Sequence, residues 1–432
     1  MPRMVILLSC VMLQVCLGTV YAWSFFQTML VRQLGWTFVE TAIPFSLAIF
    51  FIGAAAAWAG TALPRLGPRK LALTGSILFC AGYFIASLAL ATDQLMLFYI
   101  GYGVIGGAGI GLGYVTPVAT VAKWFPDRKG LATGTVVMGF GIGALLLSKL
   151  LAPVLVVYSD GDLQAVFLGL GVIFAAILLP VSLLLDDPPR GAIAPVASGT
   201  GTHEADNADV TARECLMTPQ FFCMWIVFFC NIAAGISVIS FQSPLLQDVW
   251  GLADPLLEPE TLAAYGATLI AVSSVCNGVG RLLWGLLSDR LGRTTVFRIL
   301  LGSQMVVFGV LMTEQNPWVF SILVCYVLLC FGGGFATMPS FIVDVFGSRR
   351  MSTLYGAILT AWAAAGIIGP LYVGYLKDQY PDRAVTYCFL IGIFMLGAGY
   401  IFTYLLNDDR VVVRRPTVEG TLRYFNIPVQ RT

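Results

Sequence analysis

The sequence predicts an all-α membrane protein of twelve transmembrane helices in two six-helix halves. Three observations lead to this prediction: an apolar composition, twelve long apolar runs, and basic residues that gather on one side of those runs. Hydrophobic residues make up 58% of the 432 positions and charged residues 11%, whereas soluble proteins carry about 25% charged residues. The lipid bilayer is therefore the expected surrounding of most of the chain.

Each apolar run is long enough to cross a bilayer as a helix. A hydrocarbon core of about 30 Å needs about 20 apolar residues at the rise of an α-helix. The runs fall near 4–26, 41–63, 71–92, 96–121, 130–157, 163–185, 219–243, 261–288, 295–313, 317–342, 352–377 and 384–405. The first run is longer than the apolar core of a secretory signal, so we interpret it as the first helix.

Lys and Arg are distributed unequally between the two sides of these runs. Of the 24 basic residues, 19 fall on the side of both chain termini, three (Arg32, Lys377 and Arg383) fall on the other side, and two lie within runs. Cytoplasmic loops of membrane proteins carry the excess of Lys and Arg. The sequence therefore predicts a multi-pass protein of the cell membrane, plasma or bacterial inner, with both termini cytoplasmic.

One long polar stretch divides the chain. Residues 186–218 contain a Ser/Thr/Gly-rich segment and are predicted to be a cytoplasmic linker. The expected domains are an N-terminal six-helix half (1–185), this linker, a C-terminal six-helix half (219–405) and a cytoplasmic tail (406–432).

The two halves contain repeated motifs. A motif at residues 60–67 recurs 225 positions later, and one at 125–129 recurs 221 positions later. The matched residues are Gly60, Arg65, Leu66 and Gly67 with Gly285, Arg290, Leu291 and Gly292, and Phe125, Arg128 and Lys129 with Phe346, Arg349 and Arg350. Duplicated halves around a central cavity are typical of secondary transporters.

The inventory of reactive side chains excludes several classes of protein. His203 is the only histidine, and the ten cysteines are scattered without a C-x-x-C pair, which argues against a metal centre. No Walker loop is present, so ATP hydrolysis is not expected to drive transport. We expect no enzyme activity, no cofactor and no bound metal, and a net charge of +1 gives no indication of nucleic-acid binding.

Short motifs in the loops resemble a known family. The segment Gly285-Leu-Leu-Ser-Asp289-Arg290-Leu-Gly292-Arg293 resembles the signature of the major facilitator superfamily, and residues 60–70 resemble its second copy with Pro64 in the place of the usual acid. The resemblance implies the major facilitator fold. It also implies gating loops, with these residues as candidates: Arg65, Gly67, Arg69, Arg128, Asp289, Arg290, Gly292, Arg293 and Arg349.

Other motifs indicate a group within that superfamily. Residues 123–134, Gly18–Trp23 and Asn277–Arg281 are similar to segments of monocarboxylate porters and oxalate/formate antiporters. Oxalate transporters of that group carry a lysine in the context where this chain has Trp362. Animal monocarboxylate porters carry an aspartate tied to proton coupling where this chain has Asn277. The missing second cation favours a substrate with one carboxylate, and Asn277 cannot carry a proton in that way.

Arg281 is the main candidate for substrate binding. It lies about two turns before the loop that follows the eighth run, with no Asp or Glu deep in any run. A guanidinium stays charged and presents a planar fork that fits a carboxylate, and a charge inside the bilayer is functional by default. A structural arginine bonded to backbone carbonyls is the alternative.

Further candidates have packing roles as alternatives. Asn277 lies one turn from Arg281 and either binds substrate or holds helices together. Lys149 lies near the outer face, where it either extends to the interface or provides an anion entry contact. Tyr21 and Tyr114 can offer hydroxyls to a carboxylate. Phe335 and Trp362 are candidates for apolar walls of the same cavity.

These observations lead to an expected function. We expect a secondary active transporter of small monocarboxylates, of the lactate, pyruvate and formate class, which works by alternating access with proton-coupled symport. An oxalate/formate-type anion exchanger and a non-transporting anion sensor remain as alternatives. The expected partners are a small organic anion, protons if transport is coupled to them, and the lipid bilayer. The sequence does not identify an accessory subunit.

Overall fold

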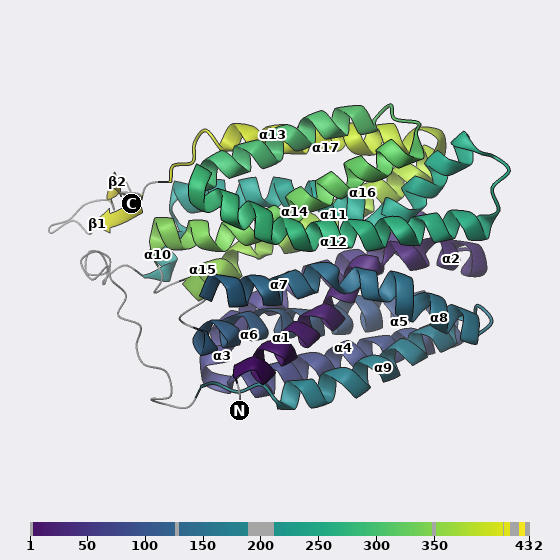
Figure 1. Ribbon diagram of the computed structural model, residues 1–432, viewed down its shortest axis with the longest axis horizontal. Helices are drawn as coiled ribbons and strands as arrows, with labels where there is room; N and C mark the ends of the chain where they lie inside the picture. The colour runs from purple at the N-terminus through teal and green to yellow at the C-terminus, as the bar shows by residue number, and fades with distance from the viewer. Residues whose placement is uncertain are drawn as a thin grey trace.

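The protein is a bundle of long helices (Figure 1). The computed structural model describes residues 3–125, 129–188, 211–347, 351–408, 410–414 and 423–427. Within these residues, twelve helices are long and apolar enough to cross a membrane, and each overlaps one of the predicted apolar runs. The predicted fold class, an all-α membrane protein with twelve spans, is confirmed.

The first six spans are built from twelve helical segments. Their bounds are α1 (Arg3–Gly18), η1 (Thr19–Ala22), α2 (Ser24–Leu34), α3 (Phe38–Leu66), α4 (Pro68–Ala91), α5 (Leu95–Phe98), η2 (Tyr99–Gly106), α6 (Gly107–Trp124), α7 (Lys129–Leu146), η4 (Leu147–Leu151), α8 (Ala152–Tyr158) and, as the sixth span, α9 (Leu163–Leu183).

The second six spans follow a short helix, α10 (Ala212–Leu216). They are α11 (Pro219–Ala253), α12 (Pro259–Leu291), α13 (Arg293–Leu311), α14 (Pro317–Phe346), α15 (Met351–Ile358) with α16 (Thr360–Gln379), and η7 (Pro381–Arg383) with α17 (Ala384–Phe402). A short antiparallel hairpin, β1 (Arg410–Arg414) and β2 (Arg423–Ile427), comes after the last span. The sequence had not indicated this hairpin.

Two glycines explain why the repeated motifs take the same shape. Gly67 separates α3 from α4 with φ +77°, and Gly292 separates α12 from α13 with φ +94°. Because side chains disfavour this region of backbone conformation, glycine is the suitable residue at both turns. The equivalent positions of the two copies therefore make equivalent turns.

Two spans contain π-helical segments that the sequence analysis had treated as regular helix. They are η2 in the fourth span and η4 in the fifth. Pro153 follows η4 and has no N–H to give to the carbonyl four residues earlier, so the regular ladder is interrupted there. In η2, Gly101 and Gly106 lie directly against Gly82 of α4, and glycine permits such close helix contact. Single π turns occur frequently at functional sites.

We call the end of the bundle that carries both chain termini the terminal end, at the left in Figure 1, and the other the opposite end. The spans before the linker contact those after it mainly through two helix pairs, α3 with α16 and α7 with α12, and also through smaller contacts such as α3 with α15 and α2 with α11. In the second pair, a Cβ atom on Gly141 would lie 2.9 Å from the Cα of Gly278. The two backbones therefore meet almost directly in the middle of the bundle.

The α3–α16 side is closed at both ends. Near the terminal end, a Cβ on Gly356 of α15 would lie 3.3 Å from the Cα of Ala57. At the opposite end, a Cβ on Gly374 of α16 would lie 3.0 Å from the carbonyl oxygen of Phe38 and 3.2 Å from the Cα of Val39, both on α3. Together with the central contact of α7 and α12, these contacts enclose the centre of the bundle.

Candidate functional site

Arg281 projects from α12 into the closed centre of the bundle. It is 3% exposed, and its two terminal nitrogens, Nη1 and Nη2, have no hydrogen-bond partner among the described residues. Its Nε lies 3.5 Å from Oδ1 of Asn277, which is at the long limit of a hydrogen bond. The arginine therefore keeps most of its donors free, and Asn277 is its nearest polar neighbour on the same helix.

Aromatic rings from both halves surround the guanidinium. Its central carbon lies 5.0 Å from the ring centre of Phe335 on α14 and 5.9 Å from that of Phe140 on α7. Such contacts are worth about 0.5–2 kcal/mol each. They stabilise the charge without using its N–H groups.

The predicted aromatic residues belong to this same cluster. The ring centre of Tyr21 lies 5.2 Å from that of Phe140, and that of Tyr114 lies 5.0 Å from it. Trp362 packs at 5.0 Å from Phe335 and at 5.4 Å from Tyr114. The structure therefore brings four of the candidates, Tyr21, Tyr114, Phe335 and Trp362, together around Arg281.

Three of these side chains also have unused polar atoms. Tyr21 Oη, Tyr114 Oη and Trp362 Nε1 are buried and form no hydrogen bond of good geometry with the described residues, although Tyr21 lies close to the guanidinium and Tyr114 lies close to Tyr355. A buried polar group left unpaired costs about 1–3 kcal/mol. Each of these groups, like the guanidinium, can donate a hydrogen bond, so the cluster offers several donors and suits a ligand rich in acceptors.

The positive charge has no protein counter-charge nearby. Among the residues that the structure describes, only Arg281 and Lys377 are buried and charged. Lys377 forms an ion pair of 2.5 Å with Asp248, whereas no described carboxylate forms one with Arg281. The centre of the bundle is therefore electrostatically complementary to an anion.

A small cavity adjoins the cluster on its opposite-end side, lined by both apolar and polar side chains. It has a volume of about 10 Å³, enough for about one water molecule. Tyr21 and Asn277 line it together with the less expected Gln242, Ser273 and Ser274. Ser273 donates to Gln242 Oε1 at 2.7 Å. The spacing of Ser273, Asn277 and Arg281, four residues apart on one helix face, was the signal in the sequence for this polar row.

Ser274 joins the two halves. Its hydroxyl donates to the carbonyl of Gly141 at 2.6 Å and accepts from the N–H of Leu145 at 3.2 Å, both on α7. Sequence reasoning had not selected Ser274, because the partner groups are backbone atoms of a distant helix.

Tyr355 on α15 is a second residue that the sequence analysis missed. It lies near enough to Tyr114, Arg281 and Tyr21 to interact electrostatically with all three. Its position seven residues before Trp362 places both near the same helix face, and this spacing could have indicated it.

Lys149 lies apart from this cluster. Its Nζ donates to the hydroxyl of Thr268 at 2.6 Å, and both groups are exposed. Thr268 precedes Arg281 by 13 residues, about 20 Å along a helix. Lys149 therefore does not belong to the cluster around Arg281, and a role in anion entry stays a prediction.

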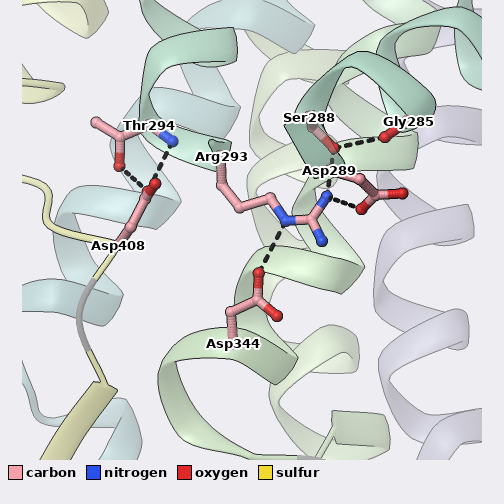
Figure 2. A network of polar contacts seen from close by, with 7 residues as sticks. All are labelled: Gly285, Ser288, Asp289, Arg293, Thr294, Asp344 and Asp408. Carbon is pink, nitrogen blue, oxygen red and sulfur yellow. Dashed lines mark hydrogen bonds and ion pairs between the residues drawn. The ribbon is translucent and has the colours of Figure 1, made fainter. Parts of the chain in front are cut away.

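Two candidate gating residues, Asp289 at the end of α12 and Arg293 at the start of α13, belong to a network of polar contacts at the terminal end (Figure 2). Arg293 lies 2.6 Å from Asp289 and 2.8 Å from Asp344 on α14, and it also contacts Ser288. Thr294, the next residue, donates through its N–H to Asp408 at 2.9 Å. These bonds tie α12, α13 and α14 to one another inside the second half.

The remaining gating candidates have separate positions. The Nη2 of Arg69 pairs at 2.8 Å with Oδ2 of Asp186, the first residue of the predicted linker. Arg65 and Arg290 are exposed at the ends of α3 and α12, and Gly67 and Gly292 make the turns described above. Arg128 and Arg349 lie outside the described residues.

Comparison with known proteins supports the family resemblance that the sequence motifs indicate. The chain matches the family model of the Major Facilitator Superfamily over residues 8–370. It is 26% identical to the oxalate:formate antiporter of Oxalobacter formigenes, covering 82% of this chain and 79% of that protein. It is 28% identical to apicoplast pyruvate carrier 1 of Toxoplasma gondii, covering 83% and 80%.

A solved structure shows the same fold. A bacterial homologue of the human lysosomal transporter Spinster, in an inward-facing and occupied conformation, superposes with a TM-score of 0.67 at 15% identity, covering 93% of this chain and 96% of that one. The similarity to an oxalate:formate antiporter and to monocarboxylate transporters confirms the resemblance drawn from the motifs. The chain belongs to the Major Facilitator Superfamily.

Proposed function

We propose that this protein is a secondary transporter of small monocarboxylates that works by alternating access. The observation that carries the proposal is the unpaired guanidinium of Arg281, buried among donors that lack acceptors. A carboxylate would supply the missing acceptors and the missing negative charge, and a guanidinium holds it with two parallel hydrogen bonds.

The surroundings of Arg281 support a small substrate with a single carboxylate. One cation faces the centre, and the neighbouring walls are the rings of Phe140, Phe335 and Trp362. A second carboxylate would be placed against apolar rings at a high desolvation cost. Relatives named as an oxalate:formate antiporter and a pyruvate carrier support the lactate, pyruvate and formate class.

Coupling to protons is the first candidate for the energy source, as expected from the resemblance to monocarboxylate porters. Anion exchange is a second candidate, which the bare charge of Arg281 favours. A carrier loaded with a monoanion would pass through the closed state with a neutral pair at its centre. An empty carrier would pass through it with an unpaired buried charge, which is costly, so exchange of one anion for another would be faster than return of the empty carrier.

The proposed placement is the cell membrane, with the terminal end in the cytoplasm. The excess of Lys and Arg on the side of both termini supports this orientation. The proposed division into two halves joined by residues 186–218 fits the same scheme, in which the halves rock about the central site.

Transport by purified protein in liposomes tests the proposal. Uptake of radiolabelled lactate, pyruvate, formate and oxalate is measured with and without a pH gradient, and with each acid inside for counterflow. We expect uptake of the monocarboxylates by wild type and its loss in Arg281→Gln, whereas Arg32→Gln, which changes an exposed arginine, stays active. Normal transport of every acid by Arg281→Gln would refute the site. Binding without flux would indicate a sensor.

A further inference from the structure

The opposite end of the bundle holds a second contact between the halves that uses charge. The carboxylate of Asp378, near the C-terminus of α16, accepts hydrogen bonds from the N–H groups of Phe38 at 2.9 Å and of Val39 at 2.8 Å. Each carboxylate oxygen takes one bond. The partners are the first two residues of α3 and lie about 340 positions away in the chain.

These bonds complete the N-terminal cap of α3. The hydroxyl of Thr37 accepts from the N–H of Glu40 at 3.1 Å, and the Glu40 carboxylate accepts from the N–H of Thr37 at 2.8 Å. The N–H groups of Phe38 and Val39 remain, and Asp378 takes both. The first N–H groups of a helix lack partners within the helix and carry a partial positive charge, so a carboxylate from the other half is a favourable ligand for them.

The residues beside Asp378 reinforce the contact. Lys377 is 5% exposed, pairs with Asp248 of α11 at 2.5 Å, and places its Nζ 4.6 Å from the ring centre of Phe38. One turn earlier, a Cβ on Gly374 would lie 3.0 Å from the carbonyl oxygen of Phe38. The start of α3 is thus held against α16 by a close backbone approach, a ring–cation contact and a carboxylate cap.

We propose that Asp378 is the latch that closes the transport path at the opposite end. The inference rests on the proposed function, because alternating access requires that this end open in one state. The cap can form only while α16 lies on α3, so it stabilises the states closed at this end. When the end opens, water replaces Asp378 at the two N–H groups, and the latch is lost without leaving an unpaired buried donor.

Accessibility of the centre from the opposite end tests the latch. Gln242 lines the central cavity and is 2% exposed, so Gln242→Cys is introduced as a reporter, and its reaction with a membrane-impermeant maleimide is followed in liposomes. The protein without the reporter gives the background of the ten native cysteines. Loss of a helix-capping carboxylate shifts an equilibrium by about 2- to 30-fold, and we expect the reporter to react faster by that factor in Asp378→Ala.

Two further variants keep the test decisive. Asp378→Asn retains the shape and one acceptor oxygen, so it should increase the labelling rate less than Asp378→Ala does. If Asp378→Ala does not fold, the labelling rate of Asp378→Asn decides the test. Asp382→Ala changes a nearby exposed acid and should leave the rate unchanged. An unchanged rate in both Asp378 variants overturns the latch. Labelling does not require a substrate. If Asp378→Ala is labelled faster while the wild-type protein transports none of the tested acids, the latch is upheld and only the proposed substrate is refuted.

Discussion

Replacing Arg281 by glutamine tests whether this arginine binds substrate or has a structural role. The guanidinium has two terminal nitrogens without partners, so a bound carboxylate would gain two charge-assisted hydrogen bonds. At about 1.5 kcal/mol each, their loss amounts to about 3 kcal/mol, which raises the half-saturation concentration about 150-fold. Arg281→Lys keeps the charge without the fork, and its effect should lie between wild type and glutamine.

The stability of the empty protein should respond differently. Arg281→Gln replaces a buried charge that has two unpaired nitrogens by a neutral amide, which costs less to bury, while two ring contacts worth about 0.5–2 kcal/mol each are lost. The empty variant should therefore melt no lower than wild type. An arginine bonded into the structure would instead cost about 3–5 kcal/mol on removal.

Thermal unfolding of purified protein, with and without pyruvate, measures both effects together. Wild type should melt at a higher temperature in the presence of pyruvate, since a ligand that binds only the folded state stabilises it. Arg281→Gln should lose this response and keep its melting temperature, while Arg32→Gln should keep both. A large drop in the melting temperature of empty Arg281→Gln would refute the reasoning, because it would reveal bonds that the native arginine makes to the protein.

Three other substitutions give further tests. A Cβ on Gly18 would overlap the backbone of α7, whereas nothing lies within 4 Å of a Cβ on Gly309. Gly18→Ala should therefore lose about 1–3 kcal/mol of stability and melt at a lower temperature than Gly309→Ala. Equal melting temperatures would contradict this packing. Asp344→Asn removes a partly buried ion pair of Arg293 and should lower the melting temperature slightly, by about 1 kcal/mol or less, without changing the substrate affinity measured by uptake. Lys149→Gln replaces an exposed contact and should leave stability unchanged; a raised half-saturation concentration in uptake would show that this lysine does serve anion entry.

The fold could be predicted because its signals are local. Twelve runs of apolar residues and the excess of Lys and Arg between them depend only on neighbouring positions in the chain. Arg281 could also be found in this way, since a permanent charge inside an apolar run needs no tertiary information to be noticed. The glycines of the repeated turns, Gly67 and Gly292, belong to the same class of signal.

The remaining features depend on contacts between distant segments. Nothing near Asp378 in the sequence indicates that it caps a helix that begins at Phe38. Ser274 binds backbone atoms of another helix, and backbone partners leave no pattern of residue types. The absence of partners for the Arg281 nitrogens, among the residues that the structure describes, likewise follows only from the packing of the whole bundle.

The meeting of Gly141 and Gly278 determines where a hinge axis between the halves would lie. The two backbones touch at this point, so a tilt about it displaces the neighbouring atoms of α7 and α12 least. Displacement grows with distance from the axis: Lys149 is eight residues along, about 12 Å, and a tilt of about 15° would move it by about 3 Å. Hydrogen bonds at the rim of the bundle would then break while the glycines stay in contact, and a bulky side chain at either glycine would shift the axis itself.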